Sequence, residues 1–335
     1  MVYLDIVSGF LGAGKTTFVN RLLDFYMRSG EKTVYIVNEY GEAGLDSKLI
    51  ANEGFESFEM TNGCICCTLR GEIVRTVANI IDEIEPTRIV FEPSGIFMFD
   101  SFFEIMDKPG IAGRCEPGNI ITVIDGMNYV SARLEHRNFI YDQIKTAPIL
   151  FISKLDKAEG KADISEIVCD VKNINPDSVI FSEGYEGLTD EVMRELFLGQ
   201  PRKPNCAPYD GEQEEHHHEH EHGHHHHDHD HEHEHDHEHH HHAHLHEAFD
   251  TVTVRLNEEH SEEWISGLVK DIKSGVYGDI IRAKGVVKSD GKNMLVNVTP
   301  MDDEIKFYPR FAEPGMTFIG GTLDHGAIES LEEKK

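Results

Sequence analysis

The chain has few basic residues and no long apolar run. Its 335 residues include 31 Lys and Arg against 61 Asp and Glu, a formal net charge of −30. A chain this acidic repels the phosphate backbone of nucleic acid and suits cations instead. No apolar run approaches the roughly 20 residues that a membrane-spanning helix needs, and the first residues lack the pattern of a secretory leader. We therefore expect a cytoplasmic protein that binds neither nucleic acid nor membranes.

Cysteine is also scarce, with six residues in the whole chain. So few cysteines do not form the disulfide framework of a small secreted protein. Cys64, Cys66 and Cys67 nevertheless lie within four positions, and three closely spaced thiolates suit a cation such as Zn²⁺. The alternatives are a redox pair, which the strain of a disulfide between neighbours disfavours, and burial as small apolar side chains.

The stretch from Ser8 to Thr17 reads SGFLGAGKTT and fits the phosphate-binding pattern G-x-x-x-x-G-K-[ST]. In this pattern backbone N–H groups surround phosphate oxygens, the lysine reaches the β- and γ-phosphates, and the next hydroxyl binds Mg²⁺. An apolar strand-like run precedes the loop and helical apolar spacing follows it, so the loop ends on a helix N-terminus. The predicted nucleotide-binding residues are Gly9, Gly12, Ala13, Gly14, Lys15, Thr16 and Thr17. Lys15 is also expected to be catalytic; the alternative is a glycine-rich turn without a ligand.

Strand-like apolar runs alternate with helical patterns up to about residue 200. This alternation predicts an α/β fold, a P-loop NTPase with a doubly wound, mostly parallel sheet. Beyond a change of composition, further strand patterns and one amphipathic helix predict a smaller C-terminal α+β domain. The predicted divisions are residues 1–203 for the P-loop domain, 204–247 for a linker, 248–323 for the C-terminal domain and 324–335 for a fraying tail.

Carboxylates follow two of the predicted strands. Glu39, Glu42 and Asp46 lie in a loop where phosphate-binding proteins commonly sense the γ-phosphate and its Mg²⁺. Glu92 ends a buried strand beside the P-loop and is placed to hold Mg²⁺, directly or through water. We predict catalytic roles for Glu42, Asp46 and Glu92. The alternative for each loop carboxylate is a solvated turn.

The tetrapeptide Ser153-Lys154-Leu155-Asp156 resembles the N-K-x-D loop with which GTPases recognise guanine. In that loop the aspartate accepts hydrogen bonds from the guanine N1 and exocyclic amine, and the lysine packs on the ring. Adenine offers neither donor, so we expect Asp156 to select GTP. Ser153 in place of asparagine loses one hydrogen-bonding arm. Ser182, after the last predicted strand of the domain, is a candidate second wall for the base.

Histidine is concentrated in one segment. From His216 to His246 the chain has 20 histidines and 8 acidic residues, with no basic residue. Such a segment buries too little apolar surface to order itself, and imidazole is a common ligand for Zn²⁺, Ni²⁺, Cu²⁺ and Co²⁺. We predict an accessory metal-binding arm that is disordered without metal. A passive acidic linker and an expression tag are the alternatives.

In this order the motifs resemble the CobW-type metal-handling GTPases, relatives of the urease and hydrogenase maturation GTPases. The resemblance rests on Gly9–Thr17, Asn38–Glu42, Asn62–Cys67, Glu92–Gly95 and Ser153–Asp156, and extends to Arg282–Gly285 and Phe318–Gly320. The family commonly has E-T-S-G and N-K-x-D where this chain has Pro93 and Ser153. The resemblance implies a transferable metal site at Cys64, Cys66 and Cys67, with Glu39 or Glu42 as candidate oxygen ligands. It also implies Mg²⁺ on Thr16, assisted by Glu92.

The predicted function is a metallochaperone that hydrolyses GTP. It binds a transition metal, Zn²⁺ first with Co²⁺ or Ni²⁺ as alternatives, at the Cys-x-Cys-Cys site and delivers it to a client metalloprotein or metal-cofactor enzyme. Two other functions stay open: a metal store or sensor whose histidine-rich arm buffers cations while the GTPase regulates, and a nucleotide kinase, which has no use for the cysteines. Self-association into a homo-oligomer is also compatible with the sequence.

Overall fold

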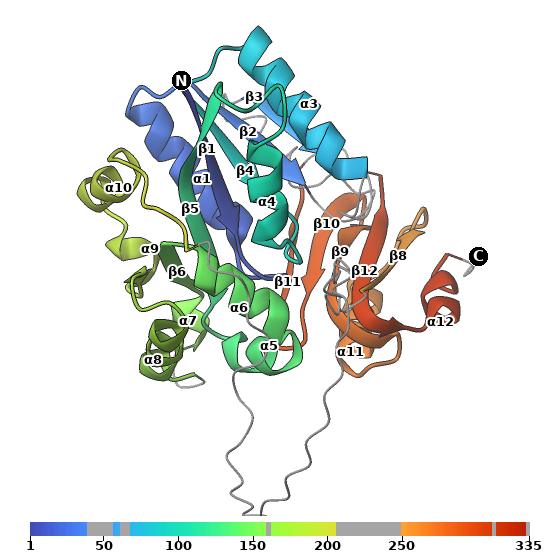
Figure 1. The fold of residues 1–335 in the computed structure, drawn as a ribbon. Helices are drawn as coiled ribbons and strands as arrows, with labels where there is room; N and C mark the ends of the chain where they lie inside the picture. The colour runs from blue at the N-terminus through green and yellow to red at the C-terminus, as the bar shows by residue number, and fades with distance from the viewer. Residues whose placement is uncertain (39–55, 61–67, 159–161, 206–248, 310–312, 333–335) are drawn as a thin grey trace, which may run out of the picture.

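The computed structural model describes residues 1–38, 56–60, 68–158, 162–205, 249–309 and 313–332. Within these ranges the chain builds two sheets, each with its own helices (Figure 1). The N-terminal sheet has seven strands, all parallel, and the C-terminal sheet has five, all antiparallel. This architecture confirms the predicted α/β fold with a smaller C-terminal α+β unit.

The N-terminal sheet is doubly wound. Its strands are β1 (Val2–Ser8), β2 (Thr33–Asn38), β3 (Glu56–Met60), β4 (Arg88–Glu92), β5 (Cys115–Asp125), β6 (Ile149–Ser153) and β7 (Val179–Phe181). They are ordered β3-β2-β4-β1-β5-β6-β7. Its helices are α1 (Lys15–Arg28), α3 (Thr68–Glu83), α4 (Phe99–Met106), α5 (Tyr129–Glu135), α6 (Arg137–Thr146), α7 (Leu155–Ala158), α8 (Ile164–Ile174), α9 (Gly184–Gly187) and α10 (Asp190–Phe197).

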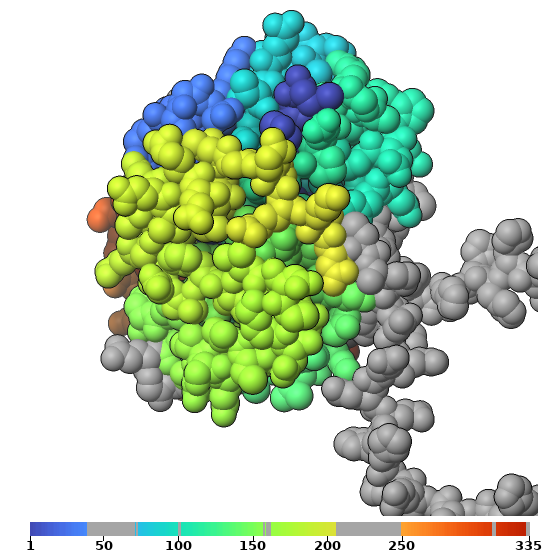
Figure 2. Space-filling model, turned by 60° about the vertical axis from the view of Figure 1, so that its left-hand side comes forward, coloured from blue at the N-terminus to red at the C-terminus, as the bar shows by residue number. Residues whose placement is uncertain are grey.

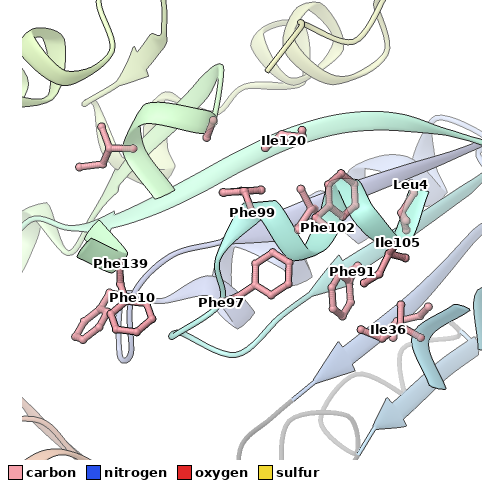
Figure 3. Close-up of a cluster of buried hydrophobic side chains, with 14 of the residues drawn as sticks. Leu4, Phe10, Ile36, Phe91, Phe97, Phe99, Phe102, Ile105, Ile120 and Phe139 are labelled. Carbon is pink, nitrogen blue, oxygen red and sulfur yellow. The ribbon is translucent and has the colours of Figure 1, made fainter. Parts of the chain in front are cut away.

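Helices cover both faces of this sheet, so its central strands are buried almost throughout, as parallel strands require. Successive side chains of a strand point to opposite faces: in β2, Val34 and Ile36 belong to the core with α3, α4 and α6, whereas Tyr35 and Val37 belong to the core with α1 and α10. Figure 3 shows part of the first core, where aromatic side chains around α4 pack over the strands. Figure 2 shows the outer surface that α8 to α10 form on the side of the molecule that lies to the left in Figure 1.

One face of the C-terminal sheet packs against a helix. Its elements are β8 (Asp250–Arg255), α11 (Glu262–Lys273), β9 (Gly278–Ser289), β10 (Lys292–Val298), β11 (Asp303–Phe307), β12 (Gly315–Leu323) and α12 (His325–Glu329). The strands are ordered β11-β10-β9-β12-β8. The side chain of Ser261 caps α11 by accepting a hydrogen bond from the backbone N–H of Trp264. The apolar face of α11, with Ile265 and Leu268, is buried against the sheet.

The expectation that the chain frays after about residue 323 is wrong for the described part of the tail. The short helix α12 follows β12, and Asp324 caps it by accepting from the backbone N–H of Ala327. Ile328 is fully buried and Leu331 nearly so. Apolar side chains of the tail therefore complete the C-terminal core. The acidic composition of this segment gave no indication of that burial. The other predicted domain boundaries stay predictions.

No helix within the described ranges combines the length and the apolar character needed to cross a bilayer.

Candidate nucleotide and metal site

The P-loop connects the carboxyl end of β1 to the first turn of α1. Gly14 has φ = 92° and serves as the N-cap of α1 without a side-chain cap. Gly9 has φ = 145°, and a Cβ added there would lie 2.4 Å from the carbonyl oxygen of Val123. Both positions therefore need glycine. The buried Lys15 directs its ammonium back over the loop, where Nζ donates to the carbonyl of Phe10 at 3.4 Å. The backbone N–H groups at this helix start are placed as an anion site requires.

Two residues predicted to hold Mg²⁺ meet at the end of this loop. The hydroxyl of Thr16 donates to Glu92 Oε1 at 2.9 Å. The other carboxylate oxygen, Oε2, accepts a hydrogen bond of 2.7 Å from the hydroxyl of Tyr35. Glu92 is 4% exposed, so its carboxylate is held by these donors in a nearly dry setting. Hard oxygen donors beside a phosphate site are the ligands that Mg²⁺ takes, so the residues present fit this ion.

Tyr35 is a site residue that the sequence did not reveal. It lies on β2, and its phenol reaches Glu92 on the neighbouring strand β4, 57 positions later in the chain. An aromatic residue within an apolar strand signals only core packing. No local pattern could therefore have identified it.

The segment that resembles a base-recognition loop is tied to the P-loop. Ser153, which is 1% exposed, places its hydroxyl 2.6 Å from the carbonyl oxygen of Ala13 and 3.0 Å from that of Ile124. Lys154 follows with φ = 56°, a left-handed backbone conformation that residues other than glycine rarely adopt. Its ammonium donates to Asp125 Oδ2 at 2.8 Å. Serine thus uses its single hydroxyl to join the two loops.

Asp125 is a second residue that the sequence did not single out. It ends β5, its Oδ1 accepts from the backbone N–H groups of Met127 and Asn128, and its Oδ2 accepts from Lys154. An acidic residue at the carboxyl end of a buried strand was a signal that could have found it, because the same argument identified Glu92. Asp125 holds Lys154 at the edge of the site.

The other predicted base-contacting residues follow the carboxyl ends of the adjacent strands β6 and β7. Asp156 is exposed in the first turn of α7, and Ser182 lies in the loop between β7 and α9. Tyr185, which the sequence did not single out, donates to the carbonyl of Gly14 at 3.5 Å. Burial raises the pKa of its phenol well above the usual range, so it stays a neutral donor. Its ring packs on Phe151 with centroids 4.8 Å apart.

Several predicted site residues lie outside the described residues. These are Glu39, Glu42, Asp46, Cys64, Cys66, Cys67 and the segment His216–His246. Within the part of the chain that the structure describes, no group of three or more His, Cys, Asp or Glu side chains could hold a metal ion. The predicted transition-metal site therefore stays a prediction.

A parallel sheet with helices on both faces, and a glycine-rich loop running from its central strand into a helix, define a P-loop nucleotide-binding protein. Comparison with known protein families identifies the family more narrowly. The sequence pattern described as CobW/HypB/UreG, nucleotide-binding domain, matches residues 4–182, more than half of the chain, and the chain belongs to this family. The match confirms the resemblance drawn from the motifs; it ends before the C-terminal sheet.

Curated relatives are similar at the level of the nucleotide-binding domain. A protein of Sinorhizobium sp named zinc chaperone CobW is 26% identical over 200 residues, covering 56% of this chain and 54% of the relative. A zinc-regulated GTPase metalloprotein activator 1 of Dictyostelium discoideum is 37% identical over 106 residues, covering 28% of this chain and 22% of the relative. The chain spans 54% and 59% of the lengths of two relatives named zinc chaperone CobW.

A solved structure, the Zn(II)-bound YjiA GTPase of E. coli, overlaps 98% of this chain and 97% of its own length at 15% identity and a TM-score of 0.42. We draw no functional conclusion from a likeness of this size.

Proposed function

We propose that this chain is a GTPase that binds a transition metal, Zn²⁺ first, and delivers it to a client metalloprotein. The observation that carries the proposal is the contact between Thr16 and Glu92 at the end of the P-loop. The family supports a nucleotide-dependent role. Relatives named zinc chaperone and zinc-regulated GTPase metalloprotein activator support the metal.

For the nucleotide, the proposed roles follow from position. Lys15 binds the β- and γ-phosphates at the start of α1, and Thr16 and Glu92 hold Mg²⁺. Bound there, Mg²⁺ supplies positive charge that neutralises the charge developing on the phosphate oxygens. Asp156, which is exposed and follows the segment that is tied to the P-loop, accepts hydrogen bonds from guanine. Glu42 and Asp46 remain the candidates for orienting the attacking water.

For the metal, the topology supports a site near the nucleotide. β2 and β3 are parallel, and Asn38 pairs with Met60 at their carboxyl ends. The residue that precedes Glu39 in the chain and the residue from which the cysteine segment follows are therefore neighbours in the sheet. β3 lies three places from β1 in the sheet, which at about 4.8 Å per strand is about 14 Å. Because these strands are parallel, the carboxyl ends of β2 and β3 lie at the same edge of the sheet as the carboxyl end of β1, where the P-loop begins.

This neighbourhood motivates a switch. A loop that contacts the γ-phosphate changes when GTP is hydrolysed, and the cysteines follow the adjacent strand. We infer that GTP with Mg²⁺ holds a state that binds metal at Cys64, Cys66 and Cys67, and that hydrolysis releases the metal to the client. Reciprocity then requires the metal to change the affinity for nucleotide by the same factor.

The decisive experiment measures the Zn²⁺ affinity of the full chain by competition with a chromophoric chelator. One sample contains a non-hydrolysable GTP analogue with Mg²⁺, the other GDP with Mg²⁺. We expect affinities that differ by about 5- to 150-fold, the usual range for coupled sites. Replacing all three clustered cysteines with serine should remove the difference. The matched control is Cys169→Ser, because Cys169 is exposed on α8. Equal affinities in the two nucleotide states would eliminate the switch.

Two further measurements separate the alternatives. A metal store loses most of its capacity and function when residues 216–246 are deleted, whereas a chaperone keeps one tight thiolate site and its nucleotide coupling. A nucleotide kinase needs a phosphoryl acceptor, so steady conversion of GTP to GDP and phosphate without an acceptor excludes that class. The same assay tests the Mg²⁺ site, because Glu92→Gln should abolish the hydrolysis that depends on Mg²⁺.

A further inference from the structure

The turn between β10 and β11 in the C-terminal sheet reaches the nucleotide site of the N-terminal domain. It runs from Thr299 to Asp302 and is held by its own hydrogen bonds. The backbone N–H of Thr299 donates to the carbonyl of Asp302 at 2.8 Å, and the N–H of Asp302 donates to the Thr299 hydroxyl at 3.2 Å. Thr299 is only 6% exposed. The turn is therefore a rigid projection of its sheet.

Thr299 contacts the P-loop. A Cβ added to Gly12, which has φ = 78°, would lie 2.8 Å from the methyl carbon Cγ2 of Thr299. The methyl group thus fills the space over Gly12 that a side chain would otherwise occupy. Because the two segments are closely packed, a movement of the P-loop at Gly12 toward Thr299 requires the turn to move as well.

Asp302 contacts the base-recognition loop. Its Oδ2 lies 3.6 Å from Lys154 Nζ, whose other acidic neighbour is Asp125 at 2.8 Å. The side chains of Lys154 and Asp302 are 16% and 20% exposed, so this pair is screened less than a surface pair. One carboxylate from each domain therefore restrains the same ammonium.

The rest of the interface keeps the turn in place. Ile281 and Ile319 of the C-terminal sheet are buried within a core cluster of the N-terminal domain. Phe249, just before β8, packs its ring on His136 with centroids 5.5 Å apart, and His136 stacks on Phe10 of the P-loop at 4.8 Å. The C-terminal part thus contacts the P-loop directly through Thr299 and indirectly through Phe249, which packs on the ring that stacks on Phe10. Because the apolar interface fixes the position of the turn, Asp302 cannot move with the Lys154 side chain and instead restricts its position.

We propose that Asp302 is a positioning residue for guanine recognition, so that the C-terminal domain completes the nucleotide site. Lys154 adopts a strained left-handed backbone conformation, and its long side chain loses rotamer freedom when it packs on a base. Asp302 and Asp125 remove much of that freedom before the nucleotide arrives, and preorganisation of this kind raises affinity. The inference rests on the proposed role of Lys154 in base binding.

The same contact works in both directions. If the turn increases the affinity for guanine nucleotide, the nucleotide must stabilise the position of the turn by an equal factor. Occupancy of the site by a guanine nucleotide is thereby communicated to the sheet that carries β11, whose five residues are all exposed. This makes the surface of the C-terminal domain dependent on nucleotide binding.

The test compares Asp302→Asn with the matched control Asp303→Asn in the full chain. Asp303 is the next residue, but it pairs with Lys273 of its own domain. The dissociation constants of fluorescent GDP and ADP analogues are measured for both variants and for Asp302→Glu. We expect Asp302→Asn to weaken GDP binding about three- to fivefold, as the loss of a partly exposed ion pair does, and Asp302→Glu to restore it. In Asp302→Asn, KM for GTP should rise together with the dissociation constant for GDP. GDP should slow hydrogen exchange at residues 299–303 in the unaltered protein but not in Asp302→Asn.

The outcomes separate this inference from the function it rests on. If the unaltered protein binds the GDP and ADP analogues equally, and Asp156→Asn changes nothing, guanine recognition by this loop is wrong and the inference is wrong with it. If guanine is preferred but Asp302→Asn behaves like Asp303→Asn, the proposed function stands and the role of Asp302 is refuted.

Discussion

A buried ion pair supports the strands that carry the P-loop, and its removal makes a sharp test. Arg88 Nη1 on β4 donates to both carboxylate oxygens of Asp5 on β1, at 2.9 and 3.0 Å. Asp5 also accepts 2.6 Å hydrogen bonds from the hydroxyl of Tyr26 on α1 and the backbone N–H of Asn119 on β5. The network thus joins β1, β4, β5 and the helix that follows the P-loop.

The expected cost follows from burial. Asp5 is fully buried and Arg88 is 4% exposed. Burial raises the pKa of the Asp5 carboxyl even though Arg88, Tyr26 and Asn119 all lower it, so desolvation outweighs the attraction. Arg88→Met leaves a buried carboxylate with two neutral donors, and we expect the free energy of unfolding to fall by about 3–5 kcal/mol. Asp5→Asn leaves the buried guanidinium without its carboxylate and should cost a similar amount.

The double variant, Asp5→Asn with Arg88→Met, removes both charges and should cost much less than the sum of the two single changes. We expect an interaction energy of about 3 kcal/mol from the double-mutant cycle. The assay is urea unfolding followed by far-UV circular dichroism at neutral pH, with unchanged m-values as the check on the fold. Additive effects, or a loss below about 1 kcal/mol for Arg88→Met, would refute the view that this pair is buried and coupled.

Three further predictions concern single positions. Gly95→Ala places a Cβ 2.5 Å from a P-loop backbone nitrogen and should lower stability by about 1–3 kcal/mol in urea unfolding, whereas exposed Gly71→Ala in α3 should not. Ser153→Ala should cost about 1 kcal/mol in the same assay and weaken GDP binding. Burial lowers the pKa of His260, stacked 3.7 Å from the chain's single tryptophan, Trp264. His260 therefore stabilises the fold above its unfolded pKa near 6.5, and this contribution is lost as the pH falls through the lower folded value. In a pH titration, the quenching of Trp264 fluorescence by protonated His260 should have its midpoint below pH 6.5. A midpoint at or above pH 6.5 would contradict the burial of His260.

Much of the candidate nucleotide site could be predicted because its signals are local. Gly9, Gly14, Lys15 and Thr16 lie within one loop whose glycines and following helix carry the phosphate chemistry by themselves. Glu92 could also be predicted, since its position at the end of a buried strand follows from periodicity. That its carboxylate meets the Thr16 hydroxyl depends on β4 lying next to β1, which is a property of strand order.

The order of the strands could not be read from the pattern, because periodicity reports which residues are buried and not which strands are neighbours. Tyr35 and Asp125 were missed for this reason, since each acts through a partner on another strand or loop. The strand β11 cannot be recognised from burial periodicity either, since its five residues are all exposed.

The sequence by itself determined the P-loop, the alternation of strands and helices and the family, because these depend on residues close together in the chain. Only the tertiary structure decided that a turn of the C-terminal sheet, near residue 300, contacts Gly12 and Lys154. Such contacts arise when two domains bury apolar surface against each other, and that packing depends on the shapes of both domains rather than on any local pattern.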